Sequence, residues 1–320
     1  MALIPALEPV REGIEDADRL LRSIVGSTEE PLRSMFNHLL GGGKRLRMAL
    51  VIAVGRMFDA GGPRFAKLAA AVEMLHTATL IHDDVVDDAS MRRGREALHS
   101  VWSVGAAVLA GDFLLARAVA LMAELDSSRI LRIFTGALCE MSVGEVRQTL
   151  VDGGKHHSRE DYLRCAKAKT ASLLEASTET AGILAGVTEL QIAALGQYGR
   201  ELGLAYQITD DVLDLIGDEE KLGKAAGSDL RQGLVTLPVL HYLDAVPNGG
   251  AVGTVLDGLT DEAHVKAAVE AVVSSGAVEA SLAEARSHVL RGREALACMP
   301  DNPFRQILWS LSGYVINREF

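Results

Sequence analysis

Apolar residues recur every three or four positions along nearly the whole chain, which is the spacing of amphipathic helices. The clearest such segments are 46–58, 65–86, 106–125 and 160–184. The short glycine-rich breaks between segments are 41–43, 61–63, 153–154 and 247–250. The sequence shows no alternating strand pattern and no βαβ rhythm, and aromatic residues make up only 4% of it. It therefore predicts an all-α fold.

The 320 residues are long enough for two domains, but no change of composition marks a linker. We therefore expect one large helical domain over residues 1–320. Acidic residues outnumber basic ones by 43 to 32, which gives a net charge of −11. This balance argues against a nucleic-acid partner, because binding to phosphates needs a basic surface.

The cysteines and the first residues of the chain bear on the compartment. Cys139, Cys165 and Cys298 are scattered and lack metal-ligand spacing, which favours a reducing environment without disulfides. The N-terminal sequence turns acidic too early for a signal peptide. A transmembrane helix needs about 18 consecutive uncharged apolar residues, and no run in this sequence is close to that length. We expect a cytoplasmic protein without a transmembrane anchor.

Two acidic clusters with the pattern Asp-Asp-x-x-Asp are the most informative motifs. Their aspartates are Asp83, Asp84 and Asp87 in the first and Asp210, Asp211 and Asp214 in the second. Residues four apart share a helix face, where like charges repel, and burial among apolar residues adds a desolvation cost. Mg²⁺ removes both costs, because it takes oxygen ligands and lets substrate phosphates complete its shell. A solvated acidic face is the alternative for either cluster alone, but two copies favour a metal site.

Basic residues near the N-terminal third suggest an anion site. Lys44 and Arg47 flank a helix start that follows three glycines, where backbone N–H groups favour an anion. The spacing is not that of a P-loop, and an ordinary helix start is an equal alternative. His76 lies seven residues before Asp83 on nearly the same helix face, and a buried core histidine is its default interpretation.

Further basic residues follow the acidic clusters. Arg92 and Arg93 lie in a long loop after the first cluster, and Lys224 lies in a long loop after the second. Arginines in such a position can clamp phosphate oxygens with two hydrogen bonds. Lys169 and Thr170 lie within a helical segment, where a solvated lysine is an equal alternative. Acidic metal ligands and separate basic clamps together predict a site for a polyphosphate ester.

Six motifs in order make the chain resemble the trans-isoprenyl diphosphate synthases, or polyprenyl synthetases. They are GGGKRLRM, HTATLIHDDVVDDASMRRG, GDFLLARA, GEVRQ, KTASLL and GLAYQITDDVLDLIGDEEKLGKAAGSDL. The resemblance covers roughly residues 41–240. It implies an antiparallel helical bundle around a deep central cavity, a homodimer, and condensation of isopentenyl diphosphate with an allylic diphosphate.

The resemblance also implies roles for matching residues. The six aspartates of the two motifs would bind Mg²⁺, three ions per active site, on the allylic diphosphate. Contacts to that diphosphate fall on Arg92, Lys169 and Lys224. Contacts to isopentenyl diphosphate fall on Lys44, Arg47, His76 and Arg93. Thr170 and Gln207 would line the developing allylic cation. Many members carry a lysine where this chain has Leu234, so one diphosphate contact is missing or supplied elsewhere.

The helix before Asp83 is expected to form a wall of the elongation cavity. Thr79, Ala78 and Leu75 follow one another down this wall, and no aromatic residue occurs there, whereas short-chain members often place one four or five positions before the motif. Each helical turn rises about 5.4 Å, so a small Ala78 predicts a long product, best estimated at about eight isoprene units. Phe134 is a candidate floor of the cavity, or an ordinary core residue.

Several other functions compete with this one. A short-chain farnesyl or geranylgeranyl diphosphate synthase remains an alternative, as does a non-catalytic partner subunit, although such subunits typically lose an aspartate motif. A phosphohydrolase of the HD type fits His82 and Asp83 but leaves the second motif unexplained. A class I terpene cyclase usually lacks the second aspartate motif. A lipid product could also require transient membrane contact for its release.

Overall fold

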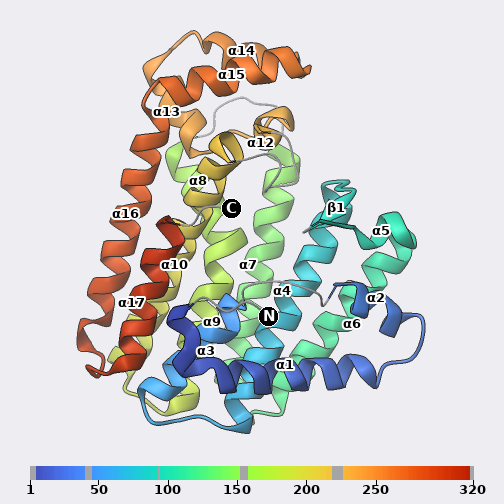
Figure 1. The fold of residues 1–320 in the computed structure, drawn as a ribbon, viewed down its shortest axis with the longest axis vertical. Coiled ribbons are helices and arrows are strands. Elements are labelled where there is room, and N and C mark those ends of the chain that lie inside the picture. Colours follow the sequence, from blue (N-terminus) through green and yellow to red (C-terminus); the bar gives the residue numbers. More distant parts are fainter. Residues whose placement is uncertain (1–4, 40–44, 93, 152–157, 218–225, 318–320) are drawn as a thin grey trace. The chain divides into compact units, whose positions relative to one another are not determined.

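Helices form nearly all of the described structure. A computed structural model of the chain describes residues 5–39, 45–92, 94–151, 158–217 and 226–317. Within these ranges the only strands are β1 (Met91–Arg92) and β2 (Arg95–Glu96), which pair as an antiparallel hairpin (Figure 1). The predicted all-α fold class is therefore confirmed.

The predicted breaks at 61–63 and 247–250 each end at the first residue of a helix. The helices of the first half are α1 (Arg11–Gly26), α2 (Leu32–Leu39), α3 (Leu46–Met57), α4 (Pro63–Val86), α5 (Leu98–Val101), α6 (Val104–Ala123) and α7 (Ser128–Val151). Those of the second half are α8 (Arg159–Ala166), α9 (Ser172–Ala185), α10 (Glu189–Ile216), α12 (Ser228–Arg231), α13 (Leu237–Ala245), α14 (Gly250–Leu256), α15 (Glu262–Ser274), α16 (Ala277–Ala295) and α17 (Pro303–Ile316). The 3-10 helices are η1 (Pro5–Val10) and η3 (Leu296–Cys298).

The chain divides into two compact units, each built from three stretches of sequence. The first unit comprises Met1–Gly136, Ala176–Gly196 and Cys298–Ser310. The second unit comprises Ala137–Glu175, Gln197–Ala297 and Leu311–Phe320. The sequence of α7, α9, α10 and α17 is divided between the two units. That residues 1–320 form a single domain stays a prediction.

In the first unit, α4 is the central helix and packs against α1, α3 and α6 (Figure 1). It begins with Pro63 in its first turn, where the missing N–H of proline costs nothing. From Phe65 to Leu75 the helix is buried on nearly every side, and this stretch is apolar except for Lys67 and Glu73. A helix that is apolar on nearly every face is stable only when it is enclosed. The first aspartate motif is therefore carried at the end of a helix whose preceding turns are enclosed.

In the second unit, two apolar clusters surround the C-terminal half of α10. One packs Leu215 against α12 to α16, with Val239, Val252 and Val265 among its members. The other joins α8, α10 and α13 and includes Tyr162. The second aspartate motif therefore lies in α10 between two parts of a hydrophobic core.

Two local predictions need correction. The predicted helix over 160–184 is interrupted by a π-helical turn, η2 (Lys167–Ala171), which separates α8 from α9. A π-helical turn adds one residue to a helix, and the spacing of apolar residues alone does not reveal this addition. The long loop after Asp88 contains the β1–β2 hairpin, whose two-residue strands are too short to leave an alternating pattern.

One described helix, α6, is long and apolar enough to cross a membrane by length and composition alone. A core helix can pass the same test, so a single such helix is weak evidence for a membrane span. Here α6 packs along α4, and Gly111 of α6 meets the ring of His82.

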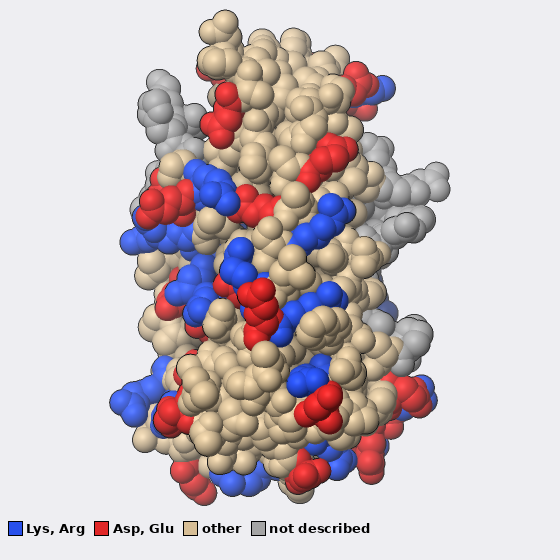
Figure 2. All heavy atoms as spheres, turned by 90° about the vertical axis from the view of Figure 1, so that its left-hand side faces the viewer, with Lys and Arg blue, Asp and Glu red and all other residues tan. Residues whose placement is uncertain are grey.

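On the face seen in Figure 2, acidic and basic side chains are interspersed among the residues drawn in colour.

Candidate active site

The first aspartate motif lies at the end of α4. Asp83 and Asp84 occupy the last turn of the helix, and Asp87 is its C-cap residue. The backbone N–H of Asp87 donates to the carbonyl oxygen of Asp83 at 2.8 Å, which keeps Asp87 in helical register. Asp83 is half-buried and Asp87 is exposed, whereas Asp84 is buried. Asp83 and Asp87 therefore share one side of the helix end, and Asp84 lies on another.

The β1–β2 hairpin returns Arg92 to Asp84. Nε of Arg92 donates to Oδ1 of Asp84 at 2.6 Å, and Nη2 pairs with the same oxygen. The side chain of Asp84 is only 3% exposed, against 34% for Arg92. Burial raises the pKa of Asp84, while the hydrogen bond and charge of Arg92 act in the opposite direction. A guanidinium group is thus held next to the motif, with part of its surface open to a ligand.

A pocket of about 40 Å³, lined by both charged and apolar residues, opens beside this ion pair. It is lined by His38, Leu39, Arg45, Thr77, Leu80, Ile81, Asp84, Arg92, Arg95 and Glu96. The His38 ring lies 2.7 Å from the carbonyl oxygen of Glu96, and Arg95 donates to the carbonyl oxygen of His38 at 2.8 Å. These two contacts tie the hairpin to the end of α2. The guanidinium groups of Arg45, Arg92 and Arg95 thus line one concave surface of the first unit.

Arg45 anchors the start of α3, although it is not among the predicted site residues. Its Nη1 lies 2.8 Å from Oε1 of Glu73 in α4, and its Nη2 lies 2.8 Å from Oδ1 of Asp18 in α1. Arg45 is buried and has a φ of +52°, an unusual conformation for a residue other than glycine. Its neighbour Arg47 is half-buried, and Lys44 lies outside the described residues. The start of α3, in the segment predicted to bind an anion, is therefore held to α1 and α4 through Arg45.

The second aspartate motif lies entirely within α10. Asp210 is half-buried, and Asp211 and Asp214 are buried. Oδ2 of Asp214 accepts from the backbone N–H of Asp229 at 3.1 Å, and its carbonyl oxygen accepts from Gly227 at 2.8 Å. These bonds fix the return of the long loop onto the motif. Lys224, predicted within that loop, lies outside the described residues, as does Arg93.

Asp211 is held by protein donors on both carboxylate oxygens. The hydroxyl of Tyr162 donates to Oδ2 at 2.6 Å, and Nε2 of Gln207 donates to Oδ1 at 2.7 Å. The carbonyl oxygen of Gln207 accepts in turn from the hydroxyl of Thr170. Burial raises the pKa of Asp211 well above its usual value, and the charge of Asp229 adds to this, whereas the two hydrogen bonds oppose it. Burial likewise raises the pKa of Tyr162.

The π-helical turn η2 carries Lys169 and Thr170, and single turns of this kind are frequent at functional sites. Two glycines allow the turn to approach its neighbours. A Cβ atom on Gly203 of α10 would lie 2.3 Å from Cα of Ala171, and one on Gly144 of α7 would lie 2.8 Å from Cβ of Ala168. Lys169 meanwhile pairs with Glu145 at 2.6 Å. The turn is thus fixed between α7 and α10, with Lys169 on one side and Thr170 on the other.

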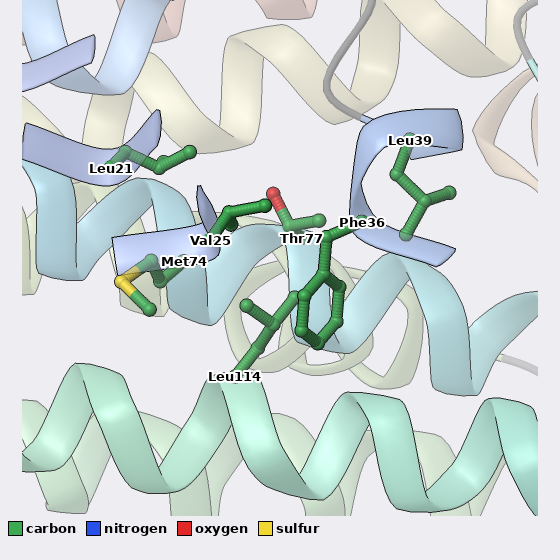
Figure 3. Close-up of a pocket in the computed structure, with 7 residues that line it drawn as sticks. All are labelled: Leu21, Val25, Phe36, Leu39, Met74, Thr77 and Leu114. Atoms are coloured by element: carbon green, nitrogen blue, oxygen red, sulfur yellow. The ribbon is translucent and has the colours of Figure 1, made fainter. Parts of the chain in front are cut away.

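The residues predicted to set product length occupy the interior. Leu75, Ala78 and Phe134 are buried, and the hydroxyl of half-buried Thr79 donates to the carbonyl oxygen of half-buried His76 at 2.9 Å. A cavity of about 10 Å³ beside α4 is lined by Leu21, Val25, Phe36, Leu39, Met74, Thr77 and Leu114 (Figure 3). It has room for about one water molecule. It is therefore too small to be the elongation cavity, and none of the predicted length-setting residues lines it.

His82 takes part in helix packing. Its Nε2 lies 3.1 Å from the carbonyl oxygen of Val108 and 3.5 Å from a carboxylate oxygen of Asp112, both in α6. Gly111 provides the space for this approach, since a Cβ there would lie 2.3 Å from the ring. This arrangement gives His82 a role between α4 and α6 and disfavours the HD-type phosphohydrolase.

The donor chemistry of the two motifs fits a divalent metal ion. Asp83 with Asp87, and Asp210 with Asp214, are carboxylates four residues apart at helix positions that share a side, and oxygen donors of this kind suit Mg²⁺. Arg92 holds Asp84, and Tyr162 and Gln207 hold Asp211. The first and last aspartates of each motif share a helix side, so that they can ligate one ion together.

The site contains partners that sequence patterns did not identify, namely Arg45, Glu73, Tyr162, Glu145 and Asp229. Each holds a residue or segment of the predicted site. Glu145 lies in the GEVRQ motif and Asp229 in the last motif, but sequence patterns assigned neither of them a role. Arg45 lies between Lys44 and Arg47 in the same motif, so its position in the sequence could have indicated it. Tyr162 lies 49 positions from Asp211, a pairing that only the folded chain reveals.

An all-α chain with two helical aspartate motifs and arginine and lysine beside them fits a class of protein, the enzymes that act on prenyl diphosphates. Sequence comparison identifies the family. The model of the polyprenyl synthetase family matches residues 29–272, which is most of the chain. The chain therefore belongs to the polyprenyl synthetase family, and it is a prenyltransferase that elongates an isoprenyl chain.

Known relatives align over almost the full length. The crystal structure of a polyprenyl synthase from Caulobacter crescentus CB15, complexed with calcium and isoprenyl diphosphate, has a TM-score of 0.92 and 37% identity and covers 98% of each chain. Heptaprenyl diphosphate synthase component 2 of Geobacillus stearothermophilus is 36% identical over 96% of this chain and 94% of its own. Octaprenyl diphosphate synthase of Escherichia coli (strain K12) is 35% identical over 87% of both. Other relatives are named for products from short-chain to nonaprenyl, so the names do not fix product length.

Proposed function

We propose that the protein is a Mg²⁺-dependent trans-prenyltransferase that condenses isopentenyl diphosphate with an allylic diphosphate, repeatedly, to a long all-trans polyprenyl diphosphate. The observation that carries the proposal is the pairing of each helical aspartate motif with a basic clamp in its own unit. Arg92 accompanies the first motif, and Lys169 is carried in the turn that Thr170 and Gln207 link to the second.

The metal ligands in this proposal are the aspartates of both motifs, with Asp83, Asp87, Asp210 and Asp214 as the principal donors. Mg²⁺, in the three ions expected per active site, would supply charge neutralisation for the allylic diphosphate. Asp84 and Asp211 keep their protein partners and hold basic and polar side chains in place. A calcium complex in a solved structural relative is consistent with use of a divalent ion.

The basic residues divide between the two substrates. Arg92, Lys169 and Lys224 bind the allylic diphosphate in this proposal. The isopentenyl diphosphate contacts are Lys44, Arg47, His76 and Arg93. Arg92 and Lys169 now pair with Asp84 and Glu145, so a diphosphate would exchange for, or share, carboxylate partners that already orient both cations.

The reaction needs no nucleophilic side chain. The allylic C–O bond breaks and diphosphate leaves, the isopentenyl double bond forms a new C–C bond to the allylic cation, and one proton is lost from the isopentenyl unit. Arg92 and Lys169 hold the departing diphosphate, and Thr170 and Gln207 line the cation. The reaction would also need water to be excluded from the site, because water would capture the cation.

The product is proposed to be long, with about eight isoprene units as the best estimate. Support comes from α4, where Ala78 and Leu75 present no aromatic side chain below the first motif. Phe134 is the proposed floor. A short-chain farnesyl or geranylgeranyl product is the alternative. Relatives named for long-chain products and relatives named for short-chain products have similar sequence identity to this chain.

A homodimer is proposed on the basis of α5 and α6. Exposed apolar residues in and between these helices are Val101, Trp102, Val104, Val108 and Leu109, the last of which is 66% exposed. Exposed apolar side chains that gather into a patch commonly mark an interface. A different partner subunit is the alternative, because one relative is named as a component of a heptaprenyl synthase. Cytoplasmic location and transient membrane contact for product release remain part of the proposal.

The test uses purified protein with isopentenyl diphosphate, a short allylic primer and Mg²⁺, with products identified by mass spectrometry after dephosphorylation. Chelation of the metal with EDTA should abolish product formation, and added Mg²⁺ should restore it. Asp83→Ala and Asp210→Ala should each abolish condensation, while Asp244→Ala, a control at an exposed position, should not. Full activity in either motif variant would overturn the metal assignment.

A further inference from the structure

Tyr162 has no part in the proposed chemistry, yet it is joined to residues that do. It lies on α8, is only 8% exposed, and donates its hydroxyl proton to Asp211. We propose that Tyr162 is a positioning residue for prenyl transfer, which fixes the direction of the Thr170 hydroxyl through Asp211 and Gln207. This inference rests on the proposed function and adds a residue and a direction to it.

With Asp211 ionised, the hydrogen bonds can run in only one order, and Asp211 sets that order. A carboxylate accepts hydrogen bonds but donates none, so the two groups that meet Asp211 must both be donors. The amide of Gln207 therefore turns its NH₂ group to Oδ1 of Asp211, at 2.7 Å. Its carbonyl oxygen then faces the opposite way, toward Thr170. The orientation of this amide follows from its partners.

Thr170 stands at the end of this chain of bonds. Its hydroxyl proton is committed to the carbonyl oxygen of Gln207. A hydroxyl has one proton and two lone pairs, so the other side of this oxygen presents electron density. An oxygen that faces a developing cation with a lone pair stabilises it, whereas one that faces it with a proton does not. The order of the bonds thus suits the proposed role of Thr170.

Tyr162 is needed because Asp211 is buried. Without the tyrosine hydroxyl, Oδ2 would lose the donor that Tyr162 supplies, and an unsatisfied buried oxygen favours rearrangement. The carboxylate could then turn, and Gln207 would no longer be held with its carbonyl toward Thr170. Tyr162 lies in the apolar cluster with Ile208 and Leu237, so its ring is fixed independently of the hydroxyl. Removal of the hydroxyl alone should therefore leave the fold intact.

The principal experiment compares Tyr162→Phe with Tyr242→Phe. Tyr242 is a matched control, because it is 7% exposed and lies in the same unit. Tyr162→Phe should lower kcat for condensation by about 10- to 100-fold while KM for isopentenyl diphosphate changes by less than about twofold. Tyr242→Phe should stay within about twofold of wild type in both. An unchanged kcat for Tyr162→Phe, or a loss confined to KM, would overturn the proposal.

A double variant tests whether Tyr162 acts through Thr170. In a Thr170→Val background, the additional Tyr162→Phe change should lower kcat by less than about threefold, because the group that it positions is already gone. Losses that multiply would show that Tyr162 acts independently of Thr170 and would also overturn the proposal. Melting curves of all variants separate these outcomes from a failure to fold.

A measurement without metal or substrate separates this inference from the proposed function. Urea midpoints of Tyr162→Phe, Gln207→Met and the double variant should be non-additive, because both residues bind the same carboxylate. Additive midpoint shifts would overturn the proposal whatever reaction the protein catalyses. The midpoint shifts could instead be non-additive while the wild-type protein forms no prenyl product. In that case the two residues share the carboxylate as described, but the proposed function is wrong, and the positioning role in prenyl transfer is wrong with it.

Discussion

Arg92 and Asp84 form an ion pair at the end of α4, with Nε of the arginine 2.6 Å from Oδ1 of the aspartate. The pair joins the second aspartate of the first motif to the hairpin that follows the motif. It holds the guanidinium beside the first motif while leaving a third of the arginine side chain exposed. The proposed diphosphate clamp is therefore oriented by the same motif that is proposed to bind the metal.

Arg92→Lys should weaken binding of the allylic substrate. Lysine keeps the charge but cannot match the two-pronged geometry that arginine offers to an anion. We expect kcat/KM for the allylic primer to fall about tenfold, equivalent to about 1.4 kcal/mol, in steady-state assays with the primer varied. Arg129→Lys, which alters an exposed pair with Glu189, is the control and should leave the value unchanged. Equal values for Arg92→Lys and wild type would remove Arg92 from the diphosphate site.

Removal of the buried partner of Arg45 should destabilise the protein. Glu73→Gln would leave the buried guanidinium short of one charged partner, at an expected cost of about 3–5 kcal/mol in the free energy of unfolding. Urea denaturation measures this cost. Glu8→Gln breaks an exposed pair with Arg11 and should cost about 0–1 kcal/mol. Similar costs for the two variants would show that Arg45 is not an anchor.

Gly203→Ala should disturb the π-helical turn. The added methyl group would lie 2.3 Å from Cα of Ala171, so the backbone beside Thr170 must shift. We expect a loss of about 1–3 kcal/mol in stability and a lower kcat. Gly136→Ala is the control, because nothing lies within 4 Å of its added methyl group, and it should stabilise α7 by about 0.5–1 kcal/mol. A Gly203→Ala protein as active and stable as wild type would contradict the close approach of α10 to η2.

Ala78→Phe should shorten the product. An aromatic ring more than one turn below Asp83 would fill the space proposed for the growing chain, so elongation should stop after far fewer than about eight units. Mass spectrometry of dephosphorylated products measures the length. Ala78→Val adds less volume and should give an intermediate distribution. A folded Ala78→Phe variant with the wild-type product distribution would show that α4 does not line the cavity.

The stability of the second unit should depend on pH through Glu201. Burial raises the pKa of this carboxyl, but hydrogen bonds and charge from His288 and Arg291 outweigh it and lower the pKa overall. A lowered folded-state pKa means that the contribution is complete above the unfolded pKa, about 4.3, and is lost as the pH falls through the folded value. Glu201→Gln should therefore cost about 2 kcal/mol at neutral pH, and less below about pH 4. A cost that does not change with pH would contradict an ionised Glu201.

The sequence predicts the fold class because the controlling signal is local. Helical periodicity between glycine breaks predicts α4 to within two residues, since its start near Pro63 and its end near Asp87 are both marked in the sequence. The π-helical turn at Lys167–Ala171 is not predicted, because a pattern that tolerates steps of three and four does not show one extra residue. The hairpin at Arg92 is not predicted either, because its strands are two residues long.

The candidate site is predictable in its charged groups and not in their supports. Aspartates at i and i+4 are readable in a sequence, as are basic residues that follow them. Which aspartate turns inward is decided by tertiary contacts, namely Arg92 for Asp84 and Tyr162 for Asp211. A spacing rule treats all three aspartates of a motif alike. Only the fold shows that Arg92 holds Asp84 and that Tyr162 and Gln207 hold Asp211.

The most direct test of prenyl transfer counts two products of one reaction. Wild-type protein receives isopentenyl diphosphate, an allylic primer and Mg²⁺, and both the diphosphate released and the five-carbon units added to the primer are quantified. Condensation predicts one diphosphate for each unit added, at every time point. Release of diphosphate without chain growth, as in hydrolysis or cyclisation of the primer, would contradict the account.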